Sequence, residues 1–305
     1  MKIKIATSQF SVSSDIIRNT HRIIDQMKAA KSAGATLIHF PEGSLSGYVG
    51  VDFGSFDNYP WDELKNATLA IMKLAMELKL WVVLGSSHPL SGKNKPHNSI
   101  YIINNKGKIQ DRYDKRFCTS DAFGKNGELK HFSPGNHFCY FSIKGIRCGT
   151  LICHEYRYPE LYREYIKMGV QLIFHSFHAA NMDPVRQKEM EDEVGRKYHP
   201  INPGNTLPEI TMPSTMISYA ANNHLWISCS NSSAPESCWG SLVVRPDGVI
   251  EGRLKKNSDE LLITEINTEI EYYDATAAWR ERAMKGVYHS GEHVNDKRSH
   301  NRYEL

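Results

Sequence analysis

Residues 138–175 read FCYFSIKGIRCGTLICHEYRYPELYREYIKMGVQLIFH. In the first half of this stretch, two apolar runs lie on either side of Lys144–Gly145, and this arrangement predicts a β-hairpin. A helix over about 160–168 follows, with Gly169 where a C-terminal stop belongs. The run LIFH at 172–175 predicts a buried strand. A hairpin, a helix and a strand in this order indicate a mixed-sheet α/β domain with a layered architecture.

The rest of the chain continues this alternation of helices and strands. Further helices are expected at 14–33, at 62–80 and ending at 215–222, and further strands at 2–9, 37–40, 81–86, 98–103, 108–113, 225–230, 241–245, 249–254 and 261–266. Asn181–Met212 is charged and then Pro-rich, which predicts an insertion that acts as a functional excursion or a lid. The polar tail over 276–305 is expected to be partly disordered or to pack on a partner subunit.

Composition excludes several classes of protein. The 305 residues allow two domains or one large α/β domain. Lys and Arg number 37 against 34 Asp and Glu, a net charge of +3, which is too balanced to indicate nucleic-acid binding. We expect no membrane partner, because no stretch approaches about 18 uninterrupted apolar residues and the opening MKIKIATSQF lacks the apolar segment of a signal peptide. The six cysteines include no CxxC pair and no zinc-finger spacing, so we expect reduced thiols in a cytoplasmic protein.

Three residues with reactive side chains stand just beyond the ends of expected strands. Glu42 follows LIHF–Pro41, Lys115 follows the strand at 108–113, and Cys153 directly follows the strand that ends at Ile152. Ligands gather at the carboxyl ends of strands in open α/β sheets. A cysteine is mostly a neutral thiol at pH 7, so it needs a nearby cation or base, and Lys115 and Glu42 can supply these. The alternative is a buried structural cysteine, a solvated lysine and a surface glutamate.

The local sequence around these residues resembles a known superfamily. The segments FPEGSLSGY (40–48), YDKRF (113–117) and GTLICHEYRYPEL (149–161) are similar to the three motif blocks of the nitrilase, or carbon–nitrogen hydrolase, superfamily. ELKHFSPG (128–135) and SCWGSLVVRPDGVI (237–250) resemble two supporting segments of that family. The resemblance covers about residues 1–275.

The resemblance implies a fold and an assembly. The expected fold is α/β, a four-layer αββα sandwich of the nitrilase type. It assigns residues 1–275 to a carbon–nitrogen hydrolase domain, with the insertion at 181–212, and leaves 276–305 as a tail. It also implies a homodimer or higher homo-oligomer in which the helix at about 158–168 packs against its copy.

The resemblance also implies roles for four residues. Glu42 would be the general base, Cys153 the nucleophile, and Lys115 the oxyanion donor together with the backbone N–H of His154. Glu128 matches the family's second glutamate, which orients the lysine and the substrate. No metal and no cofactor are expected.

Four residues are tentative substrate contacts. Tyr48 either lines the acyl pocket or belongs to the core. His154 adjoins the nucleophile. Arg157 either binds a substrate carboxylate or pairs with a nearby acid. His178, like His175 in the same HSFH run, either lines the pocket or makes a plain hydrogen bond, and we favour neither as a metal ligand.

The expected function is that of a thiol hydrolase. It would cleave a non-peptide C–N bond of a small amide or N-carbamoyl compound through a Cys153 thioester, releasing ammonia or an amine. The alternatives are a nitrilase that acts on a small nitrile, and a non-catalytic binding or scaffold protein that kept the fold. The run YAANN at 219–223 stands where the family often has Arg-Ala-x-Glu-Asn, which indicates an atypical branch and leaves the substrate open.

Overall fold

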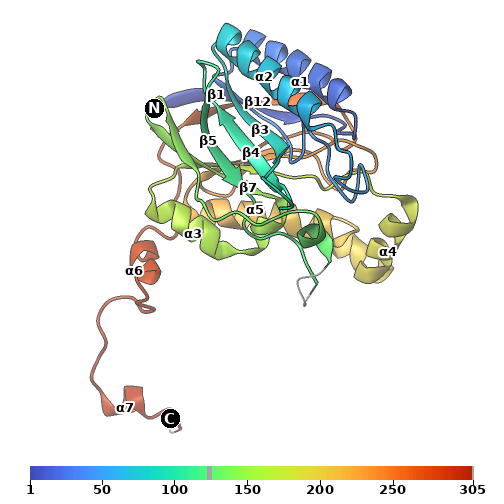
Figure 1. Cartoon of the computed structure of the whole chain (residues 1–305). Coiled ribbons are helices and arrows are strands. Elements are labelled where there is room, and N and C mark those ends of the chain that lie inside the picture. The colour runs from blue at the N-terminus through green and yellow to red at the C-terminus, as the bar shows by residue number, and fades with distance from the viewer. Residues whose placement is uncertain (122–125, 304–305) are drawn as a thin grey trace.

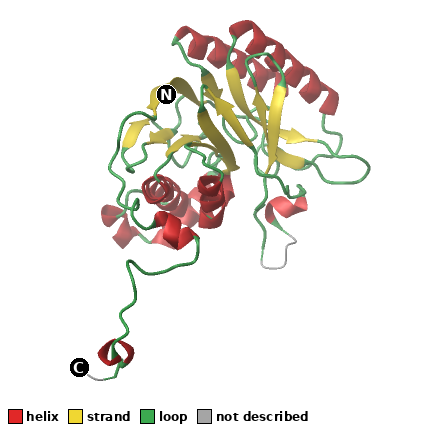
Figure 2. Cartoon of the chain, turned by 90° about the vertical axis from the view of Figure 1, so that its left-hand side faces the viewer, coloured by secondary structure: helices red, strands yellow, loops and turns green. Residues whose placement is uncertain are grey.

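Two six-stranded mixed sheets stack face to face, and a pair of helices covers the outer face of each (Figures 1 and 2). The structure is a computed structural model that describes residues 1–121 and 126–303. The predicted α/β class and its four-layer αββα arrangement are confirmed.

The first sheet has the strand order β12-β1-β2-β3-β4-β5. Its strands are β1 (Lys2–Gln9), β2 (Leu37–His39), β3 (Trp81–His88), β4 (His97–Ile103), β5 (Ile109–Asp114) and β12 (Glu260–Asn267). Strands β1, β2 and β3 run parallel, while β12, β4 and β5 join antiparallel to their neighbours. The first strand therefore pairs with the last one.

The second sheet has the order β11-β10-β9-β8-β7-β6. Its strands are β6 (Tyr140–Ile143), β7 (Ile146–Ile152), β8 (Leu172–Ser176), β9 (Trp226–Ser230), β10 (Leu242–Val244) and β11 (Ile250–Arg253). The expected hairpin around Lys144–Gly145 joins β6 to β7, and β7, β8 and β9 are parallel.

The helices complete the outer layers. Helix α1 (Ile16–Ser32) and helix α2 (Trp61–Leu78) cover the first sheet, and helix α3 (Pro159–Lys167) and helix α5 (Leu207–Asn223) cover the second (Figure 1). Asp15 caps α1 by accepting the Arg18 N–H, one residue later than expected.

The side chains of β3 point alternately to the two faces of the first sheet, so this strand contributes to two hydrophobic cores. Val82 and Leu84 pack with the helices α1 and α2, whereas Val83 faces the space between the sheets. That space also holds a polar bridge: His39 contacts Ser228 Oγ through Nδ1 and Ser176 Oγ through Nε2, each at 2.9 Å. Because all three side chains are buried, these bonds fix how the two sheets lie on each other.

The segment 181–212 differs from its expected form. It contains helix α4 (Pro184–Val194) and a 3-10 helix η3 (Arg196–Ile201), and its last six residues belong to α5. The expected helix end at 215–222 is thus the second half of a longer helix that begins after Thr206. Thr206 and Glu209 form a capping box there, and proline is tolerated in the first turn, so the Pro-rich sequence hid a helix start.

The tail leaves the body of the molecule below α3 (Figure 1). It carries two short helices, α6 (Arg280–Met284) and α7 (Lys297–His300), and its last two residues lie outside the described part. Among the described helices, none is both long and apolar enough to cross a membrane.

Candidate active site

Strand ends from both sheets deliver the reactive side chains. Glu42 follows β2, Lys115 follows β5, and both belong to the first sheet, whereas Cys153 follows β7 in the second. Gly85 on β3 allows the Glu42 loop to come close, because a Cβ at Gly85 would lie 2.1 Å from the Pro41 carbonyl oxygen. The Glu42 N–H donates to Phe177 O at 3.2 Å, which ties this loop to the second sheet.

The Lys115 ammonium lies between two buried carboxylates. Nζ donates to Glu42 Oε1 at 2.9 Å and to Glu128 Oε1 at 2.7 Å, and the exposed fractions of the three side chains are 0% for Lys115, 0% for Glu42 and 4% for Glu128. Burial opposes the charge on Lys115, but Glu128 and Glu42 outweigh it and hold the pKa of Lys115 well above its usual value. Burial likewise opposes the charge on Glu128, and the bonds with Lys115 lower the pKa of Glu128 in spite of it.

Asn98 on β4 is part of this cluster, and sequence reasoning missed it. Its Nδ2 donates to Glu42 Oε1 at 2.7 Å and to Glu128 Oε1 at 3.0 Å. The Thr119 N–H donates to Glu128 Oε2 at 2.8 Å, so both oxygens of that carboxylate are occupied. Glu42 Oε2 is buried and has no hydrogen-bond partner among the described residues. Glu42 therefore has a free oxygen that can accept a proton, whereas Glu128 is held in place.

Cys153 begins a sharp turn. Its φ is +41°, in the left-handed region, and it is the first residue of the 3-10 helix η2 (Cys153–Arg157) that leads into α3. The residue is half-buried. Burial and the Glu42 charge raise the pKa of the thiol well above its usual value, while Lys115 and the His178 backbone N–H act against them. The side chain is therefore a neutral thiol at pH 7, which needs a base before it can attack.

Glu155 ties the ends of β5 and β7 together. Its Oε1 accepts the Tyr113 hydroxyl at 2.7 Å and the Arg116 N–H at 2.8 Å, and its Oε2 accepts the Ile152 N–H at 2.8 Å. Tyr113 and Arg116 flank Lys115 in sequence, and Ile152 precedes Cys153. One buried carboxylate therefore fixes Lys115 relative to Cys153.

The four tentative substrate residues form two groups in the structure. Tyr48 stacks on His178 with ring centroids 5.1 Å apart, and the charges of Glu128, Glu42 and Cys153 add to the effect of burial on the Tyr48 phenol. These two side chains therefore face the catalytic cluster.

The other two lie on the turn after the nucleophile. His154 is half-buried, and burial, Lys115 and Arg157 lower the pKa of its imidazole to about 4, so it is neutral. Arg157 is exposed, with its guanidinium 4.8 Å from the centroid of the Tyr156 ring.

His175 makes plain hydrogen bonds, to Tyr162 Oη at 2.6 Å and to Cys153 O at 3.1 Å. Within residues 1–121 and 126–303, no three His, Cys, Asp or Glu side chains are grouped to hold a metal ion.

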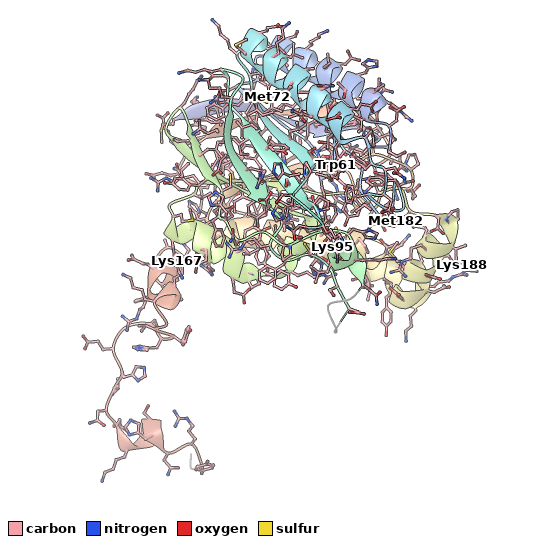
Figure 3. The ribbon with its side chains drawn as sticks, in the orientation of Figure 1. Trp61, Met72, Lys95, Lys167, Met182 and Lys188 are labelled. Atoms are coloured by element: carbon pink, nitrogen blue, oxygen red, sulfur yellow. The ribbon has the colours of Figure 1, made fainter. Side chains whose placement is uncertain are left out.

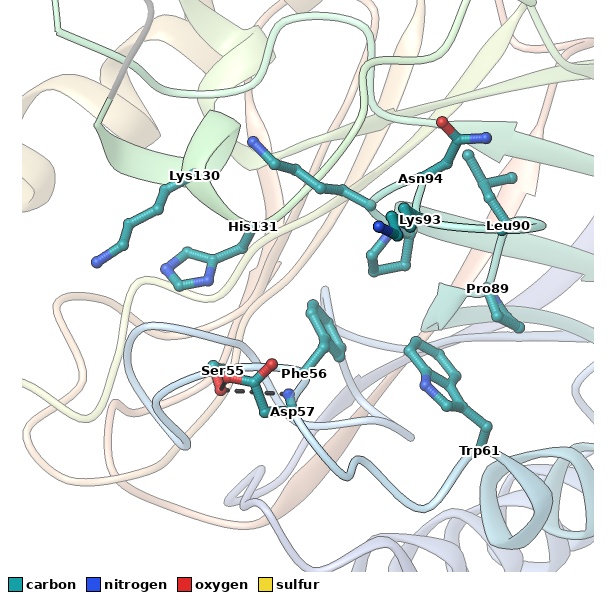
Figure 4. Close-up of a pocket in the computed structure, with 13 residues that line it drawn as sticks. Ser55, Phe56, Asp57, Trp61, Pro89, Leu90, Lys93, Asn94, Lys130 and His131 are labelled. Carbon is teal, nitrogen blue, oxygen red and sulfur yellow. Dashed lines mark hydrogen bonds between the residues drawn. The ribbon is translucent and has the colours of Figure 1, made fainter.

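A separate cavity of about 520 Å³ opens beside the turn that carries Glu128 (Figure 4). Phe56 and Trp61 line one side, and Lys130 and His131 line another. Phe132, two positions beyond Lys130, packs edge-on against Phe56 at 5.4 Å. The residues that line this cavity do not include Glu42, Lys115, Glu128 or Cys153.

The family model for carbon–nitrogen hydrolases matches residues 4–273. The chain belongs to the carbon–nitrogen hydrolase family. The resemblance that the motif blocks indicated is thus confirmed. Solved structures agree with this fold: an amidase of Nesterenkonia AN1 from the nitrilase superfamily, in a mutant form, superposes with a TM-score of 0.70 at 20% identity, covering 94% of this chain and 97% of that one.

Alignments with curated relatives of this carbon–nitrogen hydrolase cover a smaller share of each chain. The 2-oxoglutaramate amidase of Bacillus subtilis is 26% identical over 178 residues, which cover 57% of this chain and 64% of that protein. Omega-amidase NIT2 of Homo sapiens is 28% identical over 173 residues, which cover 56% of this chain and 61% of that protein. The aligned stretch thus spans less than two thirds of either relative.

Proposed function

We propose that this carbon–nitrogen hydrolase is a thiol amidase that cleaves the C–N bond of a small amide or N-carbamoyl compound. The observation that carries the proposal is the buried Lys115 ammonium, 2.9 Å from Glu42 and 2.7 Å from Glu128, whose charges all act on the Cys153 thiol. The names of the amidase relatives support the same class of reaction.

Acylation follows from the protonation states in the site. Glu42 Oε2 takes the thiol proton, and Cys153 Sγ attacks the amide carbon. Negative charge develops on the former carbonyl oxygen, where Lys115 Nζ and the backbone N–H of His154 donate to it. The proton on Glu42 passes to the nitrogen, the C–N bond breaks, and ammonia or an amine leaves a thioester on Cys153.

Hydrolysis of the thioester uses the same groups. Glu42 removes a proton from water, and the hydroxide attacks the thioester carbon. The C–S bond breaks, Cys153 regains a proton, and the acid departs. Glu128 does not exchange protons in this scheme: Thr119 and Asn98 hold it so that it keeps Lys115 charged and aimed at the oxyanion.

The test is ammonia release from a panel of linear amides, ω-amides of dicarboxylates, carbamoyl amines and nitriles. Cys153→Ala should lower turnover by several orders of magnitude while the fold survives, because no other group forms the thioester. Cys238→Ala, which removes the sulfur of a different cysteine, serves as the control. The intact mass of the wild type, quenched during turnover, should show the acyl adduct. Release from nitriles alone would favour the nitrilase, and no release or adduct would favour the non-catalytic scaffold.

We propose that the segment 181–206 influences access to the site. Asn181 Nδ2 donates to Asp52 Oδ1 at 3.0 Å, so the segment begins beside the loop that follows Glu42. Helix α4, which carries Lys188, projects to the margin of the molecule (Figure 3). Replacing 185–204 with a short Gly-Ser linker leaves the Thr206 cap intact and should change KM or substrate preference. An unchanged kcat/KM across the panel would identify a plain surface insertion.

We also propose a homodimer in which α3 and the tail take part. In this proposal residues 1–275 are the catalytic domain and 276–305 a tail. Helix α6 of the tail lies beside α3 around a cavity of about 400 Å³. Arg163 Nη1 on α3 is buried without a hydrogen-bond partner among the described residues, and Tyr288 is 85% exposed. Light scattering should give twice the chain mass, and Arg163→Glu should shift it toward the monomer.

All six cysteines are free thiols, which fits a reducing compartment such as the cytoplasm.

A further inference from the structure

A second charged pair lies beside the catalytic cluster. His178 Nε2 is 3.1 Å from Asp52 Oδ2, and the exposed fractions of the two side chains are 0% and 1%. Asp52 comes from the loop that follows Glu42, and His178 follows β8. Nothing in the reaction described above uses this pair.

The surroundings hold both members in one orientation. The Tyr48 N–H donates to Asp52 Oδ2 at 2.9 Å, and Asn181 Nδ2 donates to Asp52 Oδ1 at 3.0 Å. The Tyr48 ring stacks on the imidazole with an angle of 18° between the ring planes. The imidazole is therefore clamped between an aromatic face and a carboxylate that cannot turn away.

The surroundings favour the charged form of the imidazole. Burial opposes this charge, but Asp52 and, more weakly, Glu42 outweigh it and raise the pKa of His178 above its usual value. The third side chain against the ring, Tyr48, is neutral because burial and the nearby carboxylates raise the pKa of its phenol. Both ring nitrogens of an imidazolium are donors.

Neither of these donors has a well-aligned hydrogen-bond acceptor among the described residues. Asp52 Oδ2 forms an ion pair with Nε2 at 3.1 Å, whereas Nδ1 has no such partner among those residues. An unpaired donor on a buried cation is costly unless a ligand supplies the acceptor. Glu42 Oε2, a buried oxygen that also has no hydrogen-bond partner among the described residues, is the atom that receives the thiol proton in the proposed reaction. His178 Nδ1 and Glu42 Oε2 thus belong to neighbouring groups beside Cys153.

The backbone and the ring of His178 both interact with groups of the proposed reaction. Its N–H acts on the Cys153 thiol, and its ring interacts with the Glu42 charge. His178 therefore lies beside both Cys153 and Glu42, the two groups that a bound amide must reach. An acceptor on the acyl group, a short distance from the scissile carbonyl, would satisfy the Nδ1–H of this imidazole.

Building on the proposed amidase function, we propose that the Asp52–His178 pair selects amides whose acyl group carries a hydrogen-bond acceptor, and most strongly a carboxylate. A hydrogen bond between an imidazolium and a carboxylate is charge-assisted and about twice as strong as a neutral one. An amide with an alkyl chain in that place leaves the buried Nδ1–H donor without an acceptor, so the site disfavours it.

Equilibrium binding tests the pair apart from turnover. In the Cys153→Ala protein, calorimetry compares succinamate with butyramide, which has a methyl group where succinamate has its carboxylate. We expect succinamate to bind at least about tenfold more tightly, and His178→Gln to reduce this ratio to about threefold or less. His137→Gln is the matched control, because His137 forms a similar pair with Asp111 at 3.0 Å but is exposed. Equal affinities in Cys153→Ala, or an unchanged ratio after His178→Gln, would overturn the proposal.

The pH dependence separates charge recognition from a structural role. The imidazolium is present below the raised pKa of His178, so the succinamate preference should decline as the pH rises through that pKa. Asp52→Asn removes the group that raises the pKa, so the decline should move to lower pH. A ratio that is independent of pH in both proteins contradicts the proposal. Because binding needs no thioester, a wild type without amidase activity whose Cys153→Ala form still prefers succinamate would refute only the proposed reaction.

Discussion

Lys115→Met tests whether one buried ammonium allows Glu42 and Glu128 to remain ionised side by side. Each carboxylate places an oxygen against the same Nζ, at 2.9 and 2.7 Å. At about 5.6 Å, the largest separation of those oxygens that the two distances allow, two unit charges repel by about 3 kcal/mol at an effective dielectric constant of about 20. Without the ammonium, the buried pair takes up a proton at pH values where the carboxyls of the unfolded chain are ionised.

The sign of the effect on stability follows from proton binding. In the variant, the folded protein holds a proton at pH values above the ordinary carboxyl pKa, where the unfolded chain has released it. The free energy of unfolding therefore falls as the pH rises from the ordinary carboxyl pKa to the raised pKa of the buried pair. In the wild type, Lys115 keeps the pKa of Glu128 low in spite of burial, so the contribution of that carboxylate is constant from weakly acidic to weakly alkaline pH. We therefore expect the variant to lose about 3 kcal/mol or more of unfolding free energy near pH 8 and clearly less near pH 5.

Urea denaturation at the two pH values measures the loss, with the exposed Lys108→Met as the control. The same variant should show kcat lower by about 10²–10³-fold, because an oxyanion donor is gone. An equal loss of stability at both pH values, or a kcat within about tenfold of the wild type, would refute the reasoning.

Three further outcomes are expected. Glu128→Gln should lower kcat by at least about tenfold, because it removes the charge that orients the lysine, whereas the exposed Glu77→Gln should change nothing in the same ammonia assay. Glu155→Gln should cost about 1–3 kcal/mol in urea denaturation and also lower kcat, because an amide cannot accept all the donors that the buried carboxylate satisfies; a loss of stability with full activity would show that it does not position the lysine. Alkylation of Cys153 by iodoacetamide, followed by mass spectrometry, should keep rising well beyond pH 9, because burial and the neighbouring carboxylate raise the pKa of the thiol, whereas a plateau near pH 7 would contradict this.

Local patterns were sufficient to place three of the reactive residues. Glu42, Lys115 and Cys153 each follow a short apolar strand, and such strands are recognisable from a few residues. Glu128 had no such signal and came only from the resemblance of its segment. Its position depends on a 3-10 turn, η1 (Gly127–Lys130), whose residues carry no regular pattern.

Asn98 and Asp52 could not be predicted in the same way. Asn98 reaches the catalytic carboxylates because β4 pairs with β3 and β5, and strand pairing between distant segments is not visible in a single sequence. Asp52 meets His178 only because the loop after β2 crosses to the second sheet. The start of α5 did have a local signal in Thr206 and Glu209, but the prolines around it favoured a loop reading.

The pairing of β1 with β12 has a consequence for the newly made chain. Register runs from Lys2 opposite Asn267 to Gln9 opposite Glu260, so the edge of the first sheet stays open until nearly the whole catalytic domain has been synthesised. Cys153 leaves the ribosome more than a hundred residues earlier, on a sheet whose own strands end at Arg253. Cys153 is therefore made well before the sheet that carries Glu42 and Lys115 is complete. A polypeptide arrested in that interval lacks the strand that pairs with β1 and leaves that edge of the first sheet open.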